Sequence, residues 1–385
     1  MVSPRPTLWV ERLALTNFRN YRQFTLELAP APVVLTGPNG AGKTNLMEAV
    51  SLLAAGQGLR RATYPELAKA GTDGDWAIAA RVMTADGPVD IGTGQVSAQN
   101  ANPRAGRIVR INGETAGGSG ALADLVEMVW LTPAMDGLFT GTAGDRRRFL
   151  DRLILCFDSN YRTRLGHFER AMASRNRLLA DDVRDPARFI GIERIMAETG
   201  IAIAAARAEA VSQLAATMDL RRIRAPMSPF PWAKLAIVGA IETELATHPA
   251  IDVEERYART LSATRDRDRG AGRTLDGPHR SDFEVGHGPK VTPARLCSTG
   301  EQKALLIGLV LAHAELVRQR RNGAAPILLL DEIAAHLDPS RRAALFEEIL
   351  GLGTQAWMTG TDREAFSALE NRAQFVRVED GQVAH

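Results

Sequence analysis

Residues 37–44 read GPNGAGKT, and this stretch decides the fold of the amino-terminal region. It fits the pattern G-x-x-x-x-G-K-T, with an apolar run before it at residues 33–36 and helical spacing after it. Glycines let successive backbone N–H groups curl around a phosphate, and the start of the following helix adds positive potential. The pattern therefore predicts a strand, a phosphate-binding loop and a helix. The loop residues are Gly37, Pro38, Asn39, Gly40, Ala41, Gly42, Lys43 and Thr44.

The last two residues of this loop carry its chemistry. Lys43 is expected to reach the β- and γ-phosphates of a nucleotide such as ATP, and the Thr44 hydroxyl is expected to bind Mg²⁺. The alternative is an ordinary glycine-rich turn. The strand before the loop and the helix after it favour the phosphate site.

Residues 326–332, PILLLDE, supply the second part of a nucleotide site. An apolar run that ends in Asp331 predicts a buried parallel strand, which delivers a carboxylate to the carboxyl edge of a sheet. Asp331 is expected to hold Mg²⁺ directly or through a water. Glu332 is then the candidate general base that orients the attacking water.

Residues 297–308, CSTGEQKALLIG, begin a helix. Ser298 followed by Glu301 is typical of a capping box, and an ordinary capped helix is one interpretation. The other is a phosphate site, because Gly300 allows a close approach and Ser298 offers a hydroxyl at the positive helix end. The order of phosphate loop, capped helix and Asp-Glu strand along the chain favours the second interpretation.

The two ends of the chain share an α/β pattern, and its middle is mostly helical. Two or three strands are expected before the phosphate loop, and more strands at residues 76–113 around a loop near 92–106. Residues 120–225 show long helical patterns, residues 259–274 resemble a mobile basic loop, and a strand pattern returns at DFEVGHG. We therefore expect one domain from residues 1–118 and 281–385, with an inserted helical domain at 119–280. The expected buried stripe of the helix after the loop is Leu46, Ala49, Val50 and Leu53.

Composition limits the location and the kind of partner. The net charge is only +2, so any contact with nucleic acid must come from local basic patches. Two cysteines, far apart in the sequence, suit a reducing compartment. The chain has neither a signal-peptide pattern nor an apolar run long enough to cross a membrane, and we expect a cytoplasmic protein.

The chain resembles the RecF family, within the branch of the ABC-type ATPases that includes the SMC and Rad50 proteins. The resemblance rests on LTNFRNY (15–21), GPNGAGKT (37–44), GDRRRFLDRLI (144–154), GPHRSDF (277–283), STGEQKALLIGLVLAH (298–313), LLLDEIAAHLD (328–338) and TGTD (359–362). It implies an α/β ABC-type ATPase head, a P-loop sheet with flanking helices, carrying an inserted, mainly helical second domain.

The resemblance also implies a function in DNA repair, DNA replication and the SOS response. Two heads would close on two ATP molecules as a head-to-head homodimer. That dimer would bind DNA at gaps or single-strand/double-strand junctions and, with RecR and RecO, promote loading of RecA. A weak, DNA-dependent ATPase would serve as the switch.

Further site residues follow from the resemblance alone. Ser298, Gly300 and Gln302 match the signature that contacts the nucleotide of the partner subunit, and Asp338 matches the D-loop. Arg19 resembles an arginine that reaches phosphates in this branch, with an exposed strand residue as the alternative. Thr359 or Thr361 stands at the position where transporter ATPases have a switch histidine.

Three consecutive arginines leave a question open. Arg146, Arg147 and Arg148 form either a face that grips DNA phosphates or a solvated face paired with Asp145, Asp151 and Asp158. The competing functions are a transporter ATPase subunit, an SMC- or Rad50-like tether and a small-molecule kinase. The long helical insertion disfavours the first, the lack of sustained heptads the second, and the signature helix the third.

Overall fold

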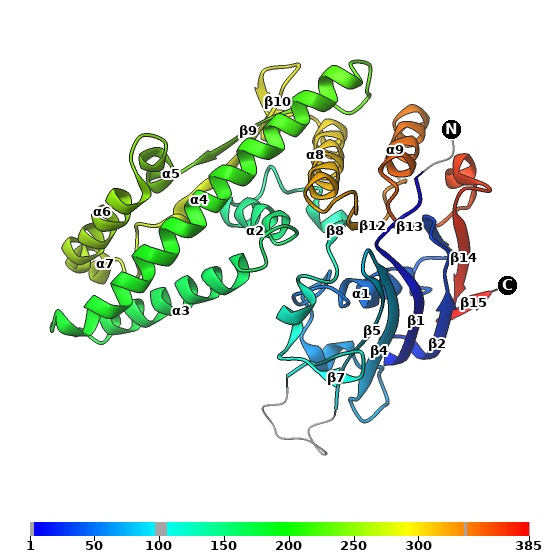
Figure 1. Cartoon of the computed structure of the whole chain (residues 1–385), viewed down its shortest axis with the longest axis horizontal. Coiled ribbons are helices and arrows are strands. Elements are labelled where there is room, and N and C mark those ends of the chain that lie inside the picture. The colour runs from blue at the N-terminus through cyan, green and yellow to red at the C-terminus, as the bar shows by residue number, and fades with distance from the viewer. Residues whose placement is uncertain (1–3, 97–105, 335–336, 385) are drawn as a thin grey trace. The chain divides into compact units, whose positions relative to one another are not determined.

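The computed structural model describes residues 4–96, 106–334 and 337–384, which form two compact units (Figure 1). The first unit consists of Met1–Asp136, Ala225–Phe230 and Leu306–His385, and the second of Gly137–Arg224 and Pro231–Leu305. The strand pairing agrees with these limits. Strand β8 (Met128–Leu131) belongs to a sheet of the first unit, whereas β10 (Asp282–His287) and β11 (Thr292–Pro293) form a sheet with β9 (Ala233–Val238) in the second. The limits of these units differ from those of the predicted domains, residues 1–118 with 281–385 and residues 119–280. The predicted domain division stays a prediction. No helix among the described residues is long and apolar enough to cross a membrane.

A largely parallel sheet forms the centre of the first unit. Its order is β15 (Gln382–Ala384), β14 (Gln374–Glu379), β3 (Val33–Thr36), β13 (Ala356–Gly360), β12 (Ile327–Leu330) and β8 (Met128–Leu131). All neighbours pair in parallel except β15, which runs antiparallel at one edge. The predicted strands at residues 33–36 and 326–332 are confirmed, and every residue of β3 and β12 is buried. The long helical patterns predicted for residues 120–225 do not include β8, whose four residues are too short a run to distinguish by periodicity.

Helices and short 3₁₀ turns complete the first unit. The helices are α1 (Lys43–Ser51), the later part of α8 (Thr299–Arg320) and α9 (Pro339–Leu352). The short turns are η1 (Tyr64–Leu67), η2 (Ser119–Leu122), η3 (Pro133–Met135) and η6 (Glu364–Leu369). The predicted apolar stripe is confirmed, because Leu46, Ala49, Val50 and Leu53 have no exposed surface. Helix α1 contacts both β1 and β13, so it packs against both sheets of this unit.

The second sheet of the first unit is antiparallel. Its order is β2 (Tyr21–Glu27), β1 (Trp9–Phe18), β4 (Trp76–Thr84), β5 (Gly87–Gln95), β6 (Ile108–Ile111) and β7 (Glu114–Thr115). The predicted loop near 92–106 begins later than expected, since β5 continues to Gln95. Residues 97–105 lie outside the described residues.

A buried glutamine ties the two sheets together. Gln355 has no exposed surface, and its amide oxygen accepts from Val10 N at 2.9 Å and from Trp357 Nε1 at 3.2 Å. Its amide nitrogen donates to Val10 O at 3.1 Å. A buried amide costs free energy unless such partners satisfy it. The side chain therefore holds β1 at a set position against β13, within a hydrophobic core that both sheets share.

The second unit is built around one long helix. Its helices are α2 (Ala143–Ile154), α3 (Tyr161–Ala180), α4 (Ala187–Arg224), α5 (Ala240–Leu245), α6 (Ala250–Ala263) and α7 (Arg265–Gly270). Its small sheet has the order β11 (Thr292–Pro293), β10 (Asp282–His287) and β9 (Ala233–Val238), with turns η4 (Pro278–Arg280) and η5 (Ala294–Leu296). Helix α4 packs against α3, α6 and β9. It ends at Arg224, before the MSPFPW sequence that was predicted to interrupt the helical pattern.

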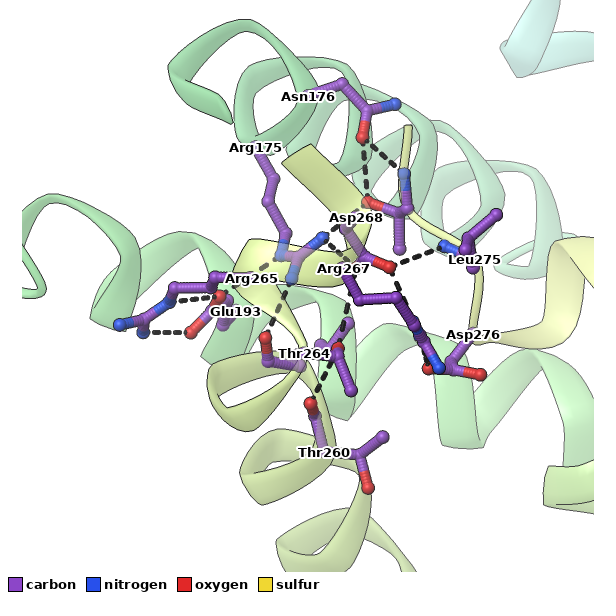
Figure 2. Close-up of polar contacts among 12 residues, drawn as sticks. Arg175, Asn176, Glu193, Thr260, Thr264, Arg265, Arg267, Asp268, Leu275 and Asp276 are labelled. Carbon is purple, nitrogen blue, oxygen red and sulfur yellow. Dashed lines mark hydrogen bonds and ion pairs between the residues drawn. The ribbon is translucent and has the colours of Figure 1, made fainter. Parts of the chain in front are cut away.

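The prediction of a mobile basic loop at residues 259–274 was wrong. The segment forms the end of α6 and all of α7, and buried ion pairs hold it in place (Figure 2). Arg175 of α3 is fully buried and donates to Glu193 Oε1 at 3.1 Å, to Asp268 Oδ2 at 2.7 Å and to Leu261 O at 2.7 Å. Aspartates alternate with the arginines of this segment, and ion pairs form between them.

Removing this buried arginine tests how α7 is held. We expect Arg175→Met to lower the free energy of unfolding by about 3–5 kcal/mol, because it removes the buried positive charge that lies between Glu193 and Asp268 and leaves these carboxylates only Arg265 and Arg267. Urea denaturation followed by circular dichroism measures this change. Arg184→Met is the matched control, since Arg184 is 66% exposed and pairs with exposed Asp182. Its expected cost is below about 1 kcal/mol. Equal losses in the two variants would contradict the structural role given to Arg175.

Candidate functional site

The predicted phosphate loop joins β3 to α1. Gly37, Gly40 and Gly42 have φ values of 140°, 82° and 112°, a region that side chains rarely adopt. Gly42 is the N-cap of α1, so Lys43 and Thr44 are its first residues. A Cβ atom at Gly37 would lie 2.1 Å from Val378 O. The loop therefore needs glycine for its backbone conformation and, at Gly37, for its packing.

Two residues of the β1–β2 hairpin hold the far end of the loop. Asn20 Nδ2 donates to Ala41 O at 3.1 Å, and the Tyr21 hydroxyl donates to Gly42 O at 3.0 Å. Asn45 Nδ2 in turn donates to Asn20 Oδ1 at 2.8 Å. Burial raises the pKa of Tyr21, so its hydroxyl remains a donor. Both residues belong to the LTNFRNY motif, which by itself does not predict hydrogen bonds to the phosphate loop.

The side chain of Lys43 points back to the first residues of the phosphate loop. Its ammonium donates to Gly37 O at 2.6 Å and to Pro38 O at 2.8 Å, and the residue is only 7% exposed. Burial lowers the pKa of Lys43, while the carboxylates of Glu332 and Asp331 act in the opposite direction. The two acidic residues are thus close enough to affect the lysine electrostatically, as a shared nucleotide site requires.

A chain of hydrogen bonds connects the start of α1 to the carboxyl end of β12. Thr44 Oγ1 donates to Asp331 Oδ1 at 3.1 Å, although 287 positions separate the two residues. Thr359 Oγ1 donates to the same oxygen at 2.7 Å and accepts from Glu332 N at 2.8 Å. The structure therefore brings the predicted Thr44, Asp331 and Glu332 together.

The hydroxyl oxygen of Thr44 and the carboxylate oxygens of Asp331 are suitable ligands for Mg²⁺. Hydroxyl and carboxylate oxygens are the hard ligands that Mg²⁺ prefers, and it usually takes one or two from the protein and the rest from phosphates and water. Within residues 4–96, 106–334 and 337–384, no group of three or more His, Cys, Asp or Glu side chains forms a metal cluster. Thr44 and Asp331 fit an ion that needs only these two.

Arg19 faces α1 rather than solvent. It lies in the hairpin turn after β1 with φ 53°, and its side chain is 21% exposed. Its guanidinium donates to both carboxylate oxygens of Glu48, at 2.8 and 2.9 Å, and to Glu66 O at 2.8 Å. The alternative of an exposed strand residue was therefore wrong. Contact of Arg19 with a phosphate stays a prediction.

The remaining predicted residues of the first unit differ in exposure and in the contacts they make. Asp338 is the N-cap of α9, where its Oδ1 accepts from Arg341 N at 2.9 Å. Glu332 is exposed and has φ 51°. Of the two candidates for the switch position, Thr359 is fully buried and Thr361 is exposed.

The signature helix begins with the predicted capping box. Ser298 N donates to Glu301 Oε2 at 3.0 Å, and Glu301 N donates to Ser298 Oγ at 3.4 Å. The Lys290 ammonium, together with the Ser298 backbone and hydroxyl, lowers the pKa of Glu301 to about 2, so its carboxylate stays ionised at neutral pH. Gln302 Nε2 donates to Cys297 O at 2.8 Å. A Cβ atom at Gly300 would meet no described atom within 4 Å, so packing within the described chain does not require glycine there.

Each of the three consecutive arginines of α2 contacts another group within the second unit. Arg146 donates to both oxygens of Asp282, at 2.8 and 2.7 Å, and Arg147 donates to Ser281 O. Arg148 pairs with Asp145. The other two aspartates of the predicted salt-bridged face bind different arginines, since Asp151 pairs with Arg207 and Asp158 with Arg164. These contacts favour the salt-bridged interpretation over a DNA-binding face.

Two alanine substitutions separate the conformational requirement of the loop from its packing. Gly40→Ala has open space for a Cβ atom, so its expected cost is only that of the left-handed backbone, about 1 kcal/mol. Gly37→Ala adds a clash with Val378 O, and overpacking costs about 1–3 kcal/mol more. Urea denaturation of both variants measures the difference. A Gly37→Ala protein as stable as Gly40→Ala would show that the two loop positions are equally open.

Comparison with known proteins shows the family to which the chain is related. The model of the RecF/RecN/SMC N terminal domain matches residues 9–384. A "DNA replication and repair protein RecF" from Mesorhizobium japonicum is 56% identical over 97% of this chain and 97% of its own length. Proteins of the same name from Rhizobium leguminosarum bv. trifolii and Brucella suis biovar 1 are 54% and 53% identical, each over 97% of this chain and over 98% and 95% of their own lengths.

Solved structures share the fold. The structure of "the recombination mediator protein RecF-ATPrS in RecFOR pathway" has a TM-score of 0.84 at 23% identity and covers 100% of this chain and 99% of that chain. The corresponding RecF-ATP structure has a TM-score of 0.80 at 24% identity, covering 98% and 99%. An Smc head domain from Pyrococcus furiosus reaches 0.53 at 17% identity, covering 98% and 95%. The predicted fold class, an α/β ATPase head with a P-loop sheet and a second, mainly helical part, is confirmed.

Proposed function

Because the chain belongs to the RecF family of DNA replication and repair proteins, we propose that it is an ATP-dependent DNA-binding switch of recombinational repair. The observation that carries the nucleotide part is the contact of Thr44 with Asp331, which brings the phosphate loop and the acidic strand end into one site. The RecF-ATP structure supports ATP as the nucleotide. Because the chain belongs to this family, we do not propose a transporter ATPase subunit, an SMC- or Rad50-like tether or a small-molecule kinase.

Each residue of this site has a proposed part in ATP hydrolysis. The backbone N–H groups of residues 37–44 would bind the phosphates, and Lys43 would offset their negative charge. Thr44 and Asp331 would hold Mg²⁺, which neutralises charge on the phosphates when bound. Glu332, exposed at the end of the same strand, would take the proton from the attacking water.

The exposed start of the signature helix suits contact with a second copy of the chain. Ser298 and Gly300 are exposed, and the capping box leaves the helix end ordered and positive. In the proposed dimer this end and Gln302 contact the nucleotide bound by the partner, and Asp338 lies at the interface. Such an arrangement is two-fold symmetric, so each subunit supplies one half of both sites.

DNA binding would depend on this dimer. The near-balanced net charge and the paired arginines of α2 argue against a single strongly basic face. A DNA surface assembled from two subunits would make binding depend on ATP. We propose DNA gaps or single-strand/double-strand junctions as the target, RecR and RecO as partners in promoting RecA loading, and the cytoplasm as the location.

Sedimentation velocity of Ser298→Arg tests the proposed dimer. We expect the wild-type chain to shift from monomer to dimer with ATP and to sediment with gapped DNA only when ATP is present. Ser298→Arg should bind ATP with nearly the affinity of the wild-type monomer, because Ser298 lies at the helix end that is proposed to contact the partner's nucleotide. The variant should neither dimerise nor bind gapped DNA with ATP.

A second arginine substitution controls for added charge. Ser262→Arg places the same side chain at an exposed position of α6 and should dimerise normally. ATP-dependent dimers of Ser298→Arg would refute contact between the signature and the partner's nucleotide. A wild-type chain that binds gapped DNA equally well without ATP would refute the switch itself.

Replacement of Glu332 tests the proposed general base. Glu332→Gln keeps the shape of the side chain but cannot accept the proton, so kcat for ATP hydrolysis should fall by about 10²- to 10⁴-fold. ATP binding should persist, and the dimer should accumulate. Phosphate release and sedimentation measure the two effects, with the exposed Glu114→Gln as the matched control. Normal turnover by Glu332→Gln would assign the base to another group.

A further inference from the structure

We infer that Thr359 is a positioning residue for ATP hydrolysis, because its hydroxyl sets both the carboxylate of Asp331 and the backbone of Glu332. This inference rests on the proposed function, since it concerns the same nucleotide site. It goes beyond the resemblance, which gives only that Thr359 or Thr361 stands at the switch position, because it names the groups that the Thr359 hydroxyl holds.

The sheet places Thr359 between the two parts of the site. Thr359 pairs with Leu35 of β3, whose next residues form the phosphate loop. On the other side, Met358 pairs with Leu330 of β12, directly before Asp331. Thr359 has no exposed surface. Its hydroxyl therefore acts within the protein, at the point where the loop and the acidic strand end meet.

The hydrogen-bond partners determine which way this hydroxyl points. Glu332 N is a donor, so at 2.8 Å it must meet a lone pair of Thr359 Oγ1. The single proton of the hydroxyl is then directed to Asp331 Oδ1 at 2.7 Å. The carboxylate of Asp331 thus receives hydrogen bonds from Thr359 and Thr44 on the same oxygen, which limits its rotation.

The bond from Glu332 N also fixes an unfavourable backbone conformation. Glu332 has φ 51°, in the left-handed region that residues with a Cβ atom seldom occupy. Without an acceptor for this N–H, residue 332 loses the contact that opposes its return to the common right-handed region. Because Glu332 directly follows Asp331, such a change would redirect the proposed general base and disturb the proposed Mg²⁺ ligand together.

Two substitutions distinguish the hydroxyl from the bulk of the side chain. Thr359→Val keeps the shape and removes both hydrogen bonds, whereas Thr359→Ser keeps the hydroxyl and removes a methyl group. We expect Thr359→Val to lower kcat for ATP hydrolysis by about 10- to 100-fold, the usual effect of losing a residue that orients a metal ligand. ATP binding in EDTA should be unchanged, and Thr359→Ser should remain close to wild type in every measurement.

A second measurement needs no nucleotide. Mn²⁺ binds the same hard oxygen ligands as Mg²⁺, and electron paramagnetic resonance follows its binding to the ATP-free protein. Thr359→Val should bind Mn²⁺ about 10-fold more weakly than wild type, with Thr359→Ser unchanged. If Thr359→Val matches wild type in Mn²⁺ affinity or in kcat, or if Thr359→Ser is as defective as Thr359→Val, the inference fails.

The two measurements keep this inference separate from the proposed function. A wild-type chain that does not bind ATP would refute the proposed function, yet the Mn²⁺ titration would still test Thr359 through Asp331. Conversely, ATP-driven dimerisation of wild type together with a fully active Thr359→Val would retain the proposed function and refute the inference. Thermal unfolding of the variants shows whether a loss of kcat reflects unfolding, in which case ATP binding in EDTA would be lost too and the inference would fail.

Discussion

The candidate site depends on one constraint, that the carboxyl ends of parallel strands lie at the same edge of a sheet. Strands β3, β12 and β13 end there, and they are followed by the phosphate loop, by Asp331 and by the segment after Thr359. Strands β3 and β12 are buried along their whole length, and the charged residues Lys43, Asp331 and Glu332 follow these strands rather than lie within them. Groups more than 280 positions apart in the sequence thus come within hydrogen-bond distance.

Buried polar side chains hold the rest of each unit in place. Gln355 connects the two sheets of the first unit. In the second unit Arg175 connects α3 to α4, α6 and α7, and Arg207 of α4 donates to both carboxylate oxygens of Asp151 at 2.8 and 3.0 Å. Each of these groups is costly to bury alone, and each has several partners. They therefore specify how the elements pack as much as they stabilise them.

The sequence predicted most of the site, because its motifs combine a residue pattern with a required context of strand, loop and helix. The residues 37–44, Asp331 and the capping box of Ser298 are local features of this kind. Prediction from the sequence failed where contacts between residues far apart in the chain determine the local structure. Strand β8 is only four residues long and owes its state to its pairing with β12. The arginines of α7 are basic in composition but paired in space, and the anchoring of the loop by Asn20 and Tyr21 requires knowing that the hairpin turns toward it.

The tie between Gln355 and Val10 also bears on how the chain folds as it is made. These residues are 345 positions apart, and β3 lies between β13 and β14, both near the end of the chain. On a ribosome, β3 must wait for nearly the whole protein before its neighbours β13 and β14 emerge. The strands of the antiparallel sheet, and Gly137–Arg224 and Pro231–Leu305 of the second unit, are made before then. Domains generally fold as units during synthesis. The parallel sheet that carries the candidate site can therefore be completed only after the last strands are made, and a chain cut before β13 would lack both neighbours of β3.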